Sequence, residues 1–316
     1  MPETPTRPDQ QHFFAQLDET PVGVVDSVDE SAAPASVWKD AWHQLRRRPM
    51  FWVSTLLISV IVLVALFPQW FTSVDPKACD LSNSSLPPSA GHPFGFNFQG
   101  CDIYARTIYG ARPSVTVGVL TTVVVVLIGA VVGAIAGFYG KWFDSILSRV
   151  TDIFFAIPFV LAAIVIMSVL YNQRGILTVV IVLGVFGWPQ IARITRGAVL
   201  SVKNSDFVTA AKALGASRAS TLVRHIMPNS AAPIIVYATV ALGTFIVAEA
   251  TLSFLGIGLP QSVVSWGGDI SDAQRRLRAN PVELFYPAAA LALTVLSFIM
   301  MGDVVRDALD PKARKR

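Results

Sequence analysis

The sequence predicts an all-α membrane protein with six transmembrane helices and with both chain ends on the cytoplasmic side. Apolar residues make up 53% of the 316 residues and charged residues only 15%, whereas a soluble domain carries about 25% charged residues. A helix needs about 20 predominantly apolar residues to cross a bilayer. The runs that meet this need are 51–71, 114–138, 153–171, 176–195, 231–258 and 284–302.

Lysine and arginine decide the predicted orientation. With the N-terminus inside, most of the 25 Lys and Arg residues fall in cytoplasmic segments, including the triplet before the first span. The exceptions are Lys77, Arg106, Arg112, Arg174, Arg275, Arg276 and Arg278. Positive residues favour the cytoplasmic side of a membrane, so we expect an N-in, C-in topology. We interpret the net charge of +4 as part of this signal, and no nucleic-acid partner is expected.

The spans divide the chain into a series of segments. The predicted series is a disordered cytoplasmic tail at 1–35, an amphipathic helix on the lipid of the inner surface at 36–50, a transmembrane domain at 51–303 and a cytoplasmic tail at 304–316. The transmembrane domain includes an outer loop at 72–113 and a cytoplasmic loop at 196–230. Within the outer loop, residues 102–112 are expected to form a helix along the outer surface.

Glycine and proline mark two of the spans. The fourth span is the weakest, because it is interrupted by Gly184, Gly187, Pro189 and Gln190. The second span carries a stripe of glycines at spacing four: Gly129, Gly133 and Gly137. Small residues at this spacing let another helix approach closely. The stripe therefore predicts packing within the chain or, as the alternative, contact with another subunit.

The two cysteines, Cys79 and Cys101, both fall in the predicted outer loop. That compartment can be oxidising, so they form either a disulfide or two unpaired thiols. A disulfide would close a loop of about 20 residues, which stabilises a fold by about 3 kcal/mol in the chain-entropy model.

The sequence lacks the motifs of an enzyme. The four histidines are far apart, no HExxH or GxSxG motif occurs, and Gly140 and Lys141 are not part of a phosphate loop. We expect no catalytic residue, no metal site and no cofactor. Glu249 is the one carboxylate well inside a predicted span, where a functional role is the default. It is expected to line a pathway or contact a neighbouring subunit, or else to hold two spans together through Thr or Ser hydroxyls.

A polar, basic segment between two apolar runs is the most informative part of the chain: DFVTAAKALGASRASTLVRHIMPN, residues 206–229. Its apolar residues at helical spacing predict two short amphipathic helices joined at Gly215. Ser217 is expected to cap the second helix and Pro228 to end it. A half-apolar hairpin must bury its apolar face, and lipid and a partner protein are both candidates.

This segment resembles the EAA loop of bacterial ABC-importer permeases, with Thr209, Ala210, Ala211, Gly215 and Pro228 at the places of its skeleton. Further motifs in the same order extend the resemblance over nearly the whole chain from about residue 36. They are WKDAWHQLRRRP, HPFGFNFQGCDIYARTIYGARPSVTVG, GFYGKWFDSILSRVTDIFFAIP, AEATLSFLGIGLP, SWGGDI and GDVVRDALDP. Together they resemble the C-type permeases of dipeptide, oligopeptide and nickel importers.

The resemblance implies a type I ABC-importer permease fold in the bacterial inner (plasma) membrane, and it implies partners. These are a second, B-type permease subunit, two cytoplasmic ATPase subunits or one fused ATPase, and an extracytoplasmic substrate-binding protein. The ATPases would bind ATP, so the chain itself is not expected to be an enzyme. The implied ATPase-coupling residues are Thr209, Ala210, Ala211, Lys212, Ala213, Leu214, Gly215 and Ala216.

Two residues depart from the family pattern. Thr209 stands where the family usually has Glu, so docking is expected to rely on shape and apolar contact rather than on a leading carboxylate. Cys101 stands where an Arg is common, which fits a bridge to Cys79.

The function that follows is half of the translocation pathway of an ATP-driven importer of di- or oligopeptides. One alternative is a permease for nickel or another non-peptide solute. An ion-coupled secondary carrier is the alternative from a different class, and the absence of paired intramembrane carboxylates from the sequence argues against it.

Overall fold

A computed structural model describes residues 37–309, and in that range the chain is helical with no β-strand. The predicted tail at 1–35 and residues 310–316 lie outside the described residues. The α-helices are α1 (Val37–Leu45), α2 (Pro49–Leu66), α3 (Ile103–Tyr139), α4 (Lys141–Ala156), α5 (Phe159–Val169), α6 (Ile176–Val202), α7 (Asp206–Ala213), α8 (Arg218–Ser220), α9 (Met227–Phe254), α10 (Trp266–Gln274) and α11 (Val282–Leu309). Short 3₁₀ helices lie at Pro68–Trp70, Leu81–Asn83 and Tyr171–Gln173, and a π-helix spans Thr221–Ile226.

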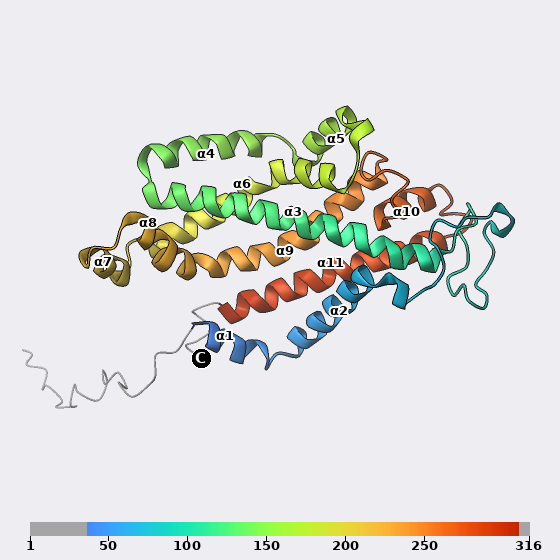
Figure 1. Ribbon diagram of the computed structural model, residues 1–316, viewed down its shortest axis with the longest axis horizontal. Coiled ribbons are helices and arrows are strands. Elements are labelled where there is room, and N and C mark those ends of the chain that lie inside the picture. Colours follow the sequence, from blue (N-terminus) through green and yellow to red (C-terminus); the bar gives the residue numbers. More distant parts are fainter. Residues whose placement is uncertain (1–36, 310–316) are drawn as a thin grey trace, which may run out of the picture.

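The long helices run side by side along one axis (Figure 1). Helices α3 and α6 pack against each other, α9 packs on both, and α11 packs against α9 and α2. One end of the bundle carries α7, α8 and α1, and we call it the hairpin end (Figure 1). The opposite end carries α10 and the loop 67–102, and we call it the disulfide end.

Five helices are long and apolar enough to cross a membrane: α2, α3, α6, α9 with the helical turns before it, and α11. The third predicted span, 153–171, is wrong as one straight helix, because α4 and α5 meet at an angle of 78°. The break lies at Ile157, which is extended at φ −93° and ψ 119°. A proline disfavours the helical conformation in the residue before it, and Pro158 follows.

The start of α3 corrects the predicted outer loop. Residues 102–112 do not form a separate surface helix, because α3 runs without interruption through 37 residues, about 55 Å at 1.5 Å per residue. Asp102 fixes its first turn by accepting a hydrogen bond from the N–H of Ala105 at 2.5 Å. Pro113 lies inside this helix and does not end it. The helix therefore outruns the bilayer's hydrocarbon core of about 30 Å.

Two of the predicted spans continue as helices beyond their predicted ends. The weak fourth span is a continuous helix, α6, with Pro189 inside it and Gly187 packed against Phe245 and Val125. Helix α11 continues to Leu309, past the end of the predicted sixth span at 302. In α6, the contacts of Gly187 with α3 and α9 accompany a helix that its glycines and proline alone do not favour.

The glycine stripe faces α6 within the same chain. A Cβ atom at Gly129 would lie 2.9 Å from the Trp188 carbonyl oxygen, and one at Gly137 would lie 3.0 Å from the Arg196 carbonyl oxygen. At Gly133 it would lie 2.8 Å from Cβ of Thr195. Contacts this short leave no space for a side chain. The structure therefore favours packing within the chain, the first of the two alternatives for this stripe.

We expect Gly133→Val to destabilise the isolated chain by about 1–3 kcal/mol, the usual cost of overpacking. The added side chain would push α3 away from α6. The measurement is the thermal unfolding midpoint of the purified chain in detergent.

The matched control is Gly197→Val on α6, because no atom lies within 4 Å of a Cβ built there. Equal midpoints for the two variants would contradict the close α3–α6 contact.

Candidate functional site

The hairpin end is built around α7 and the glycine that ends it. Gly215 has φ +86°, a left-handed conformation that favours glycine. Its N–H donates to the Lys212 carbonyl, and the N–H of Ala216 donates to the Ala211 carbonyl, each at 3.0 Å. These two bonds close the last turn of α7 as a Schellman motif. The prediction of a helix end at Gly215 is confirmed.

The second half of the hairpin begins as predicted and continues differently. The Ser217 hydroxyl accepts a hydrogen bond from the Ser220 N–H at 3.2 Å, which confirms the predicted cap. Pro228 does not end the second helix, because it occupies the first turn of α9. The π-helix at Thr221–Ile226 stands before it, and the Met227 N–H bonds to the Leu222 carbonyl five residues back. The first turn of a helix tolerates a proline, so the chain runs from α8 into α9.

A small apolar core fixes the hairpin to the bundle. Val208 of α7 is fully buried, and it shares a cluster with Phe138 of α3, Val199 of α6 and Ile226 of the π-helix. Helix α7 is therefore held against three neighbours and is not a free loop.

The other side of the hairpin is uncovered within the described chain. Leu214 is 89% exposed and Phe207 45% exposed. The residues predicted for coupling lie on this surface: Thr209, Ala210, Lys212, Ala213 and Gly215 are exposed, and Ala211 and Ala216 are partly exposed. An anchored helix that presents apolar and small side chains outward has the form of a docking surface.

Glu249 lies in the last turns of α9, towards the disulfide end, and is fully buried. Its Oε1 accepts a hydrogen bond from Ser253 Oγ at 2.7 Å, and its Oε2 has no hydrogen-bond partner. The start of α10 packs beside it on α9. Glu249 is thus enclosed within its own chain, and its hydrogen-bond partner is a hydroxyl of its own helix rather than of an adjacent span. Its functional role stays a prediction.

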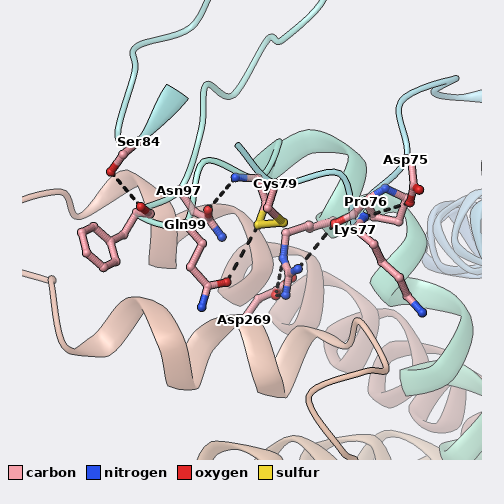
Figure 2. The surroundings of a disulfide bond; sticks show 11 residues. Asp75, Pro76, Lys77, Cys79, Ser84, Asn97, Gln99 and Asp269 are labelled. Carbon is pink, nitrogen blue, oxygen red and sulfur yellow. Dashed lines mark hydrogen bonds and ion pairs between the residues drawn. A yellow bond between two sulfur atoms is a disulfide. The ribbon is translucent and has the colours of Figure 1, made fainter. Parts of the chain in front are cut away.

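At the disulfide end, Cys79 and Cys101 are joined by a disulfide bond (Figure 2). Cys101 is fully buried, and its backbone N–H donates to the Asn97 side-chain oxygen at 2.9 Å. In addition, the backbone N–H of Asp80 donates to the carbonyl of Gly100 at 3.2 Å. The disulfide thus ties the first part of loop 67–102 to the residues directly before α3.

Arg106 connects three parts of the disulfide end. Its Nε donates to Asp269 Oδ1 of α10 at 2.8 Å, and its Nη1 donates to the Pro76 carbonyl at 3.5 Å. Figure 2 shows Asp269 beside the disulfide loop. Only 12% of the Arg106 side chain and 10% of the Asp269 side chain are exposed. Burial raises the pKa of Asp269, and the guanidinium of Arg106 opposes that shift.

Comparisons with known proteins identify the family of this chain. The family model for the binding-protein-dependent transport system inner membrane component matches residues 129–315, and a model for the N-terminal TM domain of oligopeptide transport permease C matches residues 36–88. The first match covers more than half of the chain. The chain belongs to the binding-protein-dependent transport system inner membrane component family.

Three relatives show how far the similarity to other family members extends. The oligopeptide transport system permease protein OppC of Bacillus subtilis (strain 168) is 40% identical over 92% of this chain and 94% of its own length. The dipeptide transport system permease protein DppC of Alkalihalophilus pseudofirmus is 36% identical over 90% and 93%. The glutathione transport system permease protein GsiD of Escherichia coli O6:K15:H31 is 36% identical over 88% and 91%.

Sequence reasoning missed the residues that hold this family member together at the disulfide end. Arg106 and Arg112 counted only as exceptions to the charge rule, yet each closes a contact between elements. Arg112 donates to the Ala65 and Leu66 carbonyls at 2.9 and 2.7 Å, which satisfies the last turn of α2. The sequence did contain a signal for these two arginines, because the predicted topology places them on the side of the membrane where basic residues are not favoured.

We expect Arg106→Met to destabilise the chain by about 3–5 kcal/mol, because it leaves the buried carboxylate of Asp269 without its partner. The control is Arg48→Met, which breaks an exposed pair with Asp307 whose side chains are 39% and 57% exposed. That loss should be at most about 1 kcal/mol. The unfolding midpoint in detergent compares the two variants, and equal shifts would contradict the structural role of Arg106.

Proposed function

We propose that this chain is a permease subunit of an ATP-driven importer of di- or oligopeptides, and that partner ATPases supply the energy. The observation that best supports this proposal is the structure of the hairpin. Its Val208 is buried in the bundle, whereas its Leu214 is exposed. The named relatives are oligopeptide, dipeptide and glutathione transport permeases, which supports a peptide or peptide-like solute.

The proposed coupling follows from how the hairpin is attached. An ATPase that moves α7 also moves the core around Val208, because packed interiors transmit displacement. Lys203, just after α6, donates to the Phe138 carbonyl at 2.5 Å and to the Gly137 carbonyl at 3.3 Å, so the ends of α3 and α6 are joined there. The second arm of the hairpin runs into α9. One docking event thus acts on three long helices together.

The proposed pathway face follows α9. One hollow of about 650 Å³ is lined by Asn229, Pro233 and Tyr237 of α9 together with Arg306 of α11. A second, of about 310 Å³, lies beside the α4–α5 break and also includes Tyr237. Both lie open on the single chain, and we propose that a second, B-type permease subunit closes them into a translocation pathway.

The proposed orientation places the hairpin end in the cytoplasm and the disulfide end outside. Helix α1 and the C-terminal end of α11 lie at the hairpin end (Figure 1), as an N-in, C-in topology requires. The excess of Lys and Arg in the segments at that end supports it. The disulfide end then faces an oxidising compartment and a substrate-binding protein.

The test of the function is peptide uptake by proteoliposomes that contain this chain, its partner permease and the ATPases, with binding protein added outside. We expect uptake that depends on ATP. Leu214→Ser should reduce uptake and weaken ATPase association about tenfold, since losing an apolar anchor costs about 1.4 kcal/mol or more.

Leu81→Ser is the control for this experiment, because Leu81 is 73% exposed but lies in the loop at the disulfide end. It should leave ATPase association unchanged. ATP-independent uptake by the native complex would contradict the proposed energy source. Normal ATPase association in the Leu214 variant would refute the docking surface.

Labelling of the cysteines tests the orientation. On intact cells a thiol reagent that cannot cross the membrane should label the chain only after a reductant opens the Cys79–Cys101 bond, because the described structure holds no free cysteine. Labelling without reductant would show unpaired thiols. Labelling only after cell lysis and reduction would place the disulfide end in the cytoplasm and reverse the topology.

A further inference from the structure

A cavity of about 580 Å³ opens at the disulfide end between three separate segments. The disulfide loop contributes Lys77 and Gln99, the turn before α6 contributes Arg174, and the stretch from the end of α9 into α10 contributes Ser262 and Arg275. Its volume lies within the range of about 300–1,000 Å³ that is typical of small-molecule sites. None of the residues that carry the docking hairpin lines it.

The charges that line the cavity are unbalanced. Its cationic residues are Lys77, Arg106, Arg174 and Arg275, and its one carboxylate is Asp272. Asp269 already neutralises Arg106. Among the described residues, the other three cations form no ion pair. An excess of positive charge therefore faces the cavity, and a concave site concentrates such a field.

One of these cations is held in position by its neighbours. Arg174 donates from Nη1 to the Gly256 carbonyl at 2.7 Å, and its guanidinium carbon lies 3.8 Å from the centre of the Tyr171 ring. These contacts fix the side chain and leave its charge uncompensated. A guanidinium that is fixed in advance loses little entropy on binding a planar anion.

We propose that this cavity binds the carboxylate of a peptide as the solute enters the permease, an inference that rests on the proposed function. Guanidinium groups recognise carboxylates through paired, charge-assisted hydrogen bonds. Arg174 in the turn before α6 and Arg275 at the end of α10 both line the cavity, so either guanidinium offers the carboxylate a charged partner. A peptide whose C-terminus is amidated lacks this charge and binds weakly.

The electrostatic part of the proposal is tested on Ser262→Cys, a neutral lining position that is exposed. The two native cysteines are joined to each other, so the new thiol is the reactive one. In the purified importer, a methanethiosulfonate that carries a sulfonate should react several-fold faster than its trimethylammonium counterpart. Adding Lys77→Gln and Arg275→Gln should abolish that preference.

The matched control is Ser89→Cys, an exposed serine of the loop 67–102 that does not line this cavity. The thiol of Ser89→Cys should show no more preference for the anionic reagent than Ser262→Cys shows when Lys77→Gln and Arg275→Gln are added. An equal preference at both positions would mean a general surface field, and it would overturn the inference.

The ligand is tested by protection of the Ser262→Cys thiol. Trialanine should slow its labelling several-fold, and trialanine amide at the same concentration should not. No protection by trialanine, or equal protection by both peptides, overturns the proposal. Protection by peptide-free binding protein alone would also overturn it, because the cavity would then be a protein-docking surface.

The same preparation separates this inference from the proposed function. ATP-dependent uptake by the native importer reports on the function. If uptake is present and trialanine gives no protection, only the cavity assignment fails. If ATP-dependent uptake is absent, the proposed function fails, whatever the labelling shows.

Discussion

The close contact between α3 and α6 sets the geometry of the whole helix bundle. Carbonyl groups and side chains of α6 occupy the space that side chains at Gly129, Gly133 and Gly137 would need. In lipid, helices associate through packing and hydrogen bonds rather than through a hydrophobic effect, so the shape of this surface sets the distance between the two helices. Helix α9 packs against both of them, and α11 packs on α9.

The two ends of the bundle are stabilised by different kinds of contact. At the hairpin end a buried valine and a lysine that donates to helix-end carbonyls make a rigid attachment, and the exposed side remains apolar. At the disulfide end one covalent bond and one buried ion pair bind the loop, α3 and α10 together. Contacts between segments far apart in the chain therefore brace the bundle at both ends.

Proline shows how the same residue acts differently in different surroundings. Pro158 breaks the third span, whereas Pro113, Pro189 and Pro233 lie inside continuous helices. Pro228 is accommodated because it lies in the first turn of α9. In lipid, a proline inside a helix is tolerated where neighbouring helices, side chains or a local change of turn satisfy the backbone groups that it leaves without a partner. That cannot be read from the residues next to each proline.

The helical class, the approximate positions of most spans, and the glycine and serine that shape the hairpin can all be predicted from the residues alone. These follow from local rules, because apolar length, a left-handed glycine and a capping hydroxyl act within a few residues. Three features emerge only once the helices are packed: the glycine stripe meets α6, Glu249 is enclosed within its own chain, and Arg106 pairs with Asp269. The same packing also brings Lys77, Arg174 and Arg275 to one cavity. Each of these depends on segments far apart in the chain, and their meeting is set by helix packing rather than by sequence spacing.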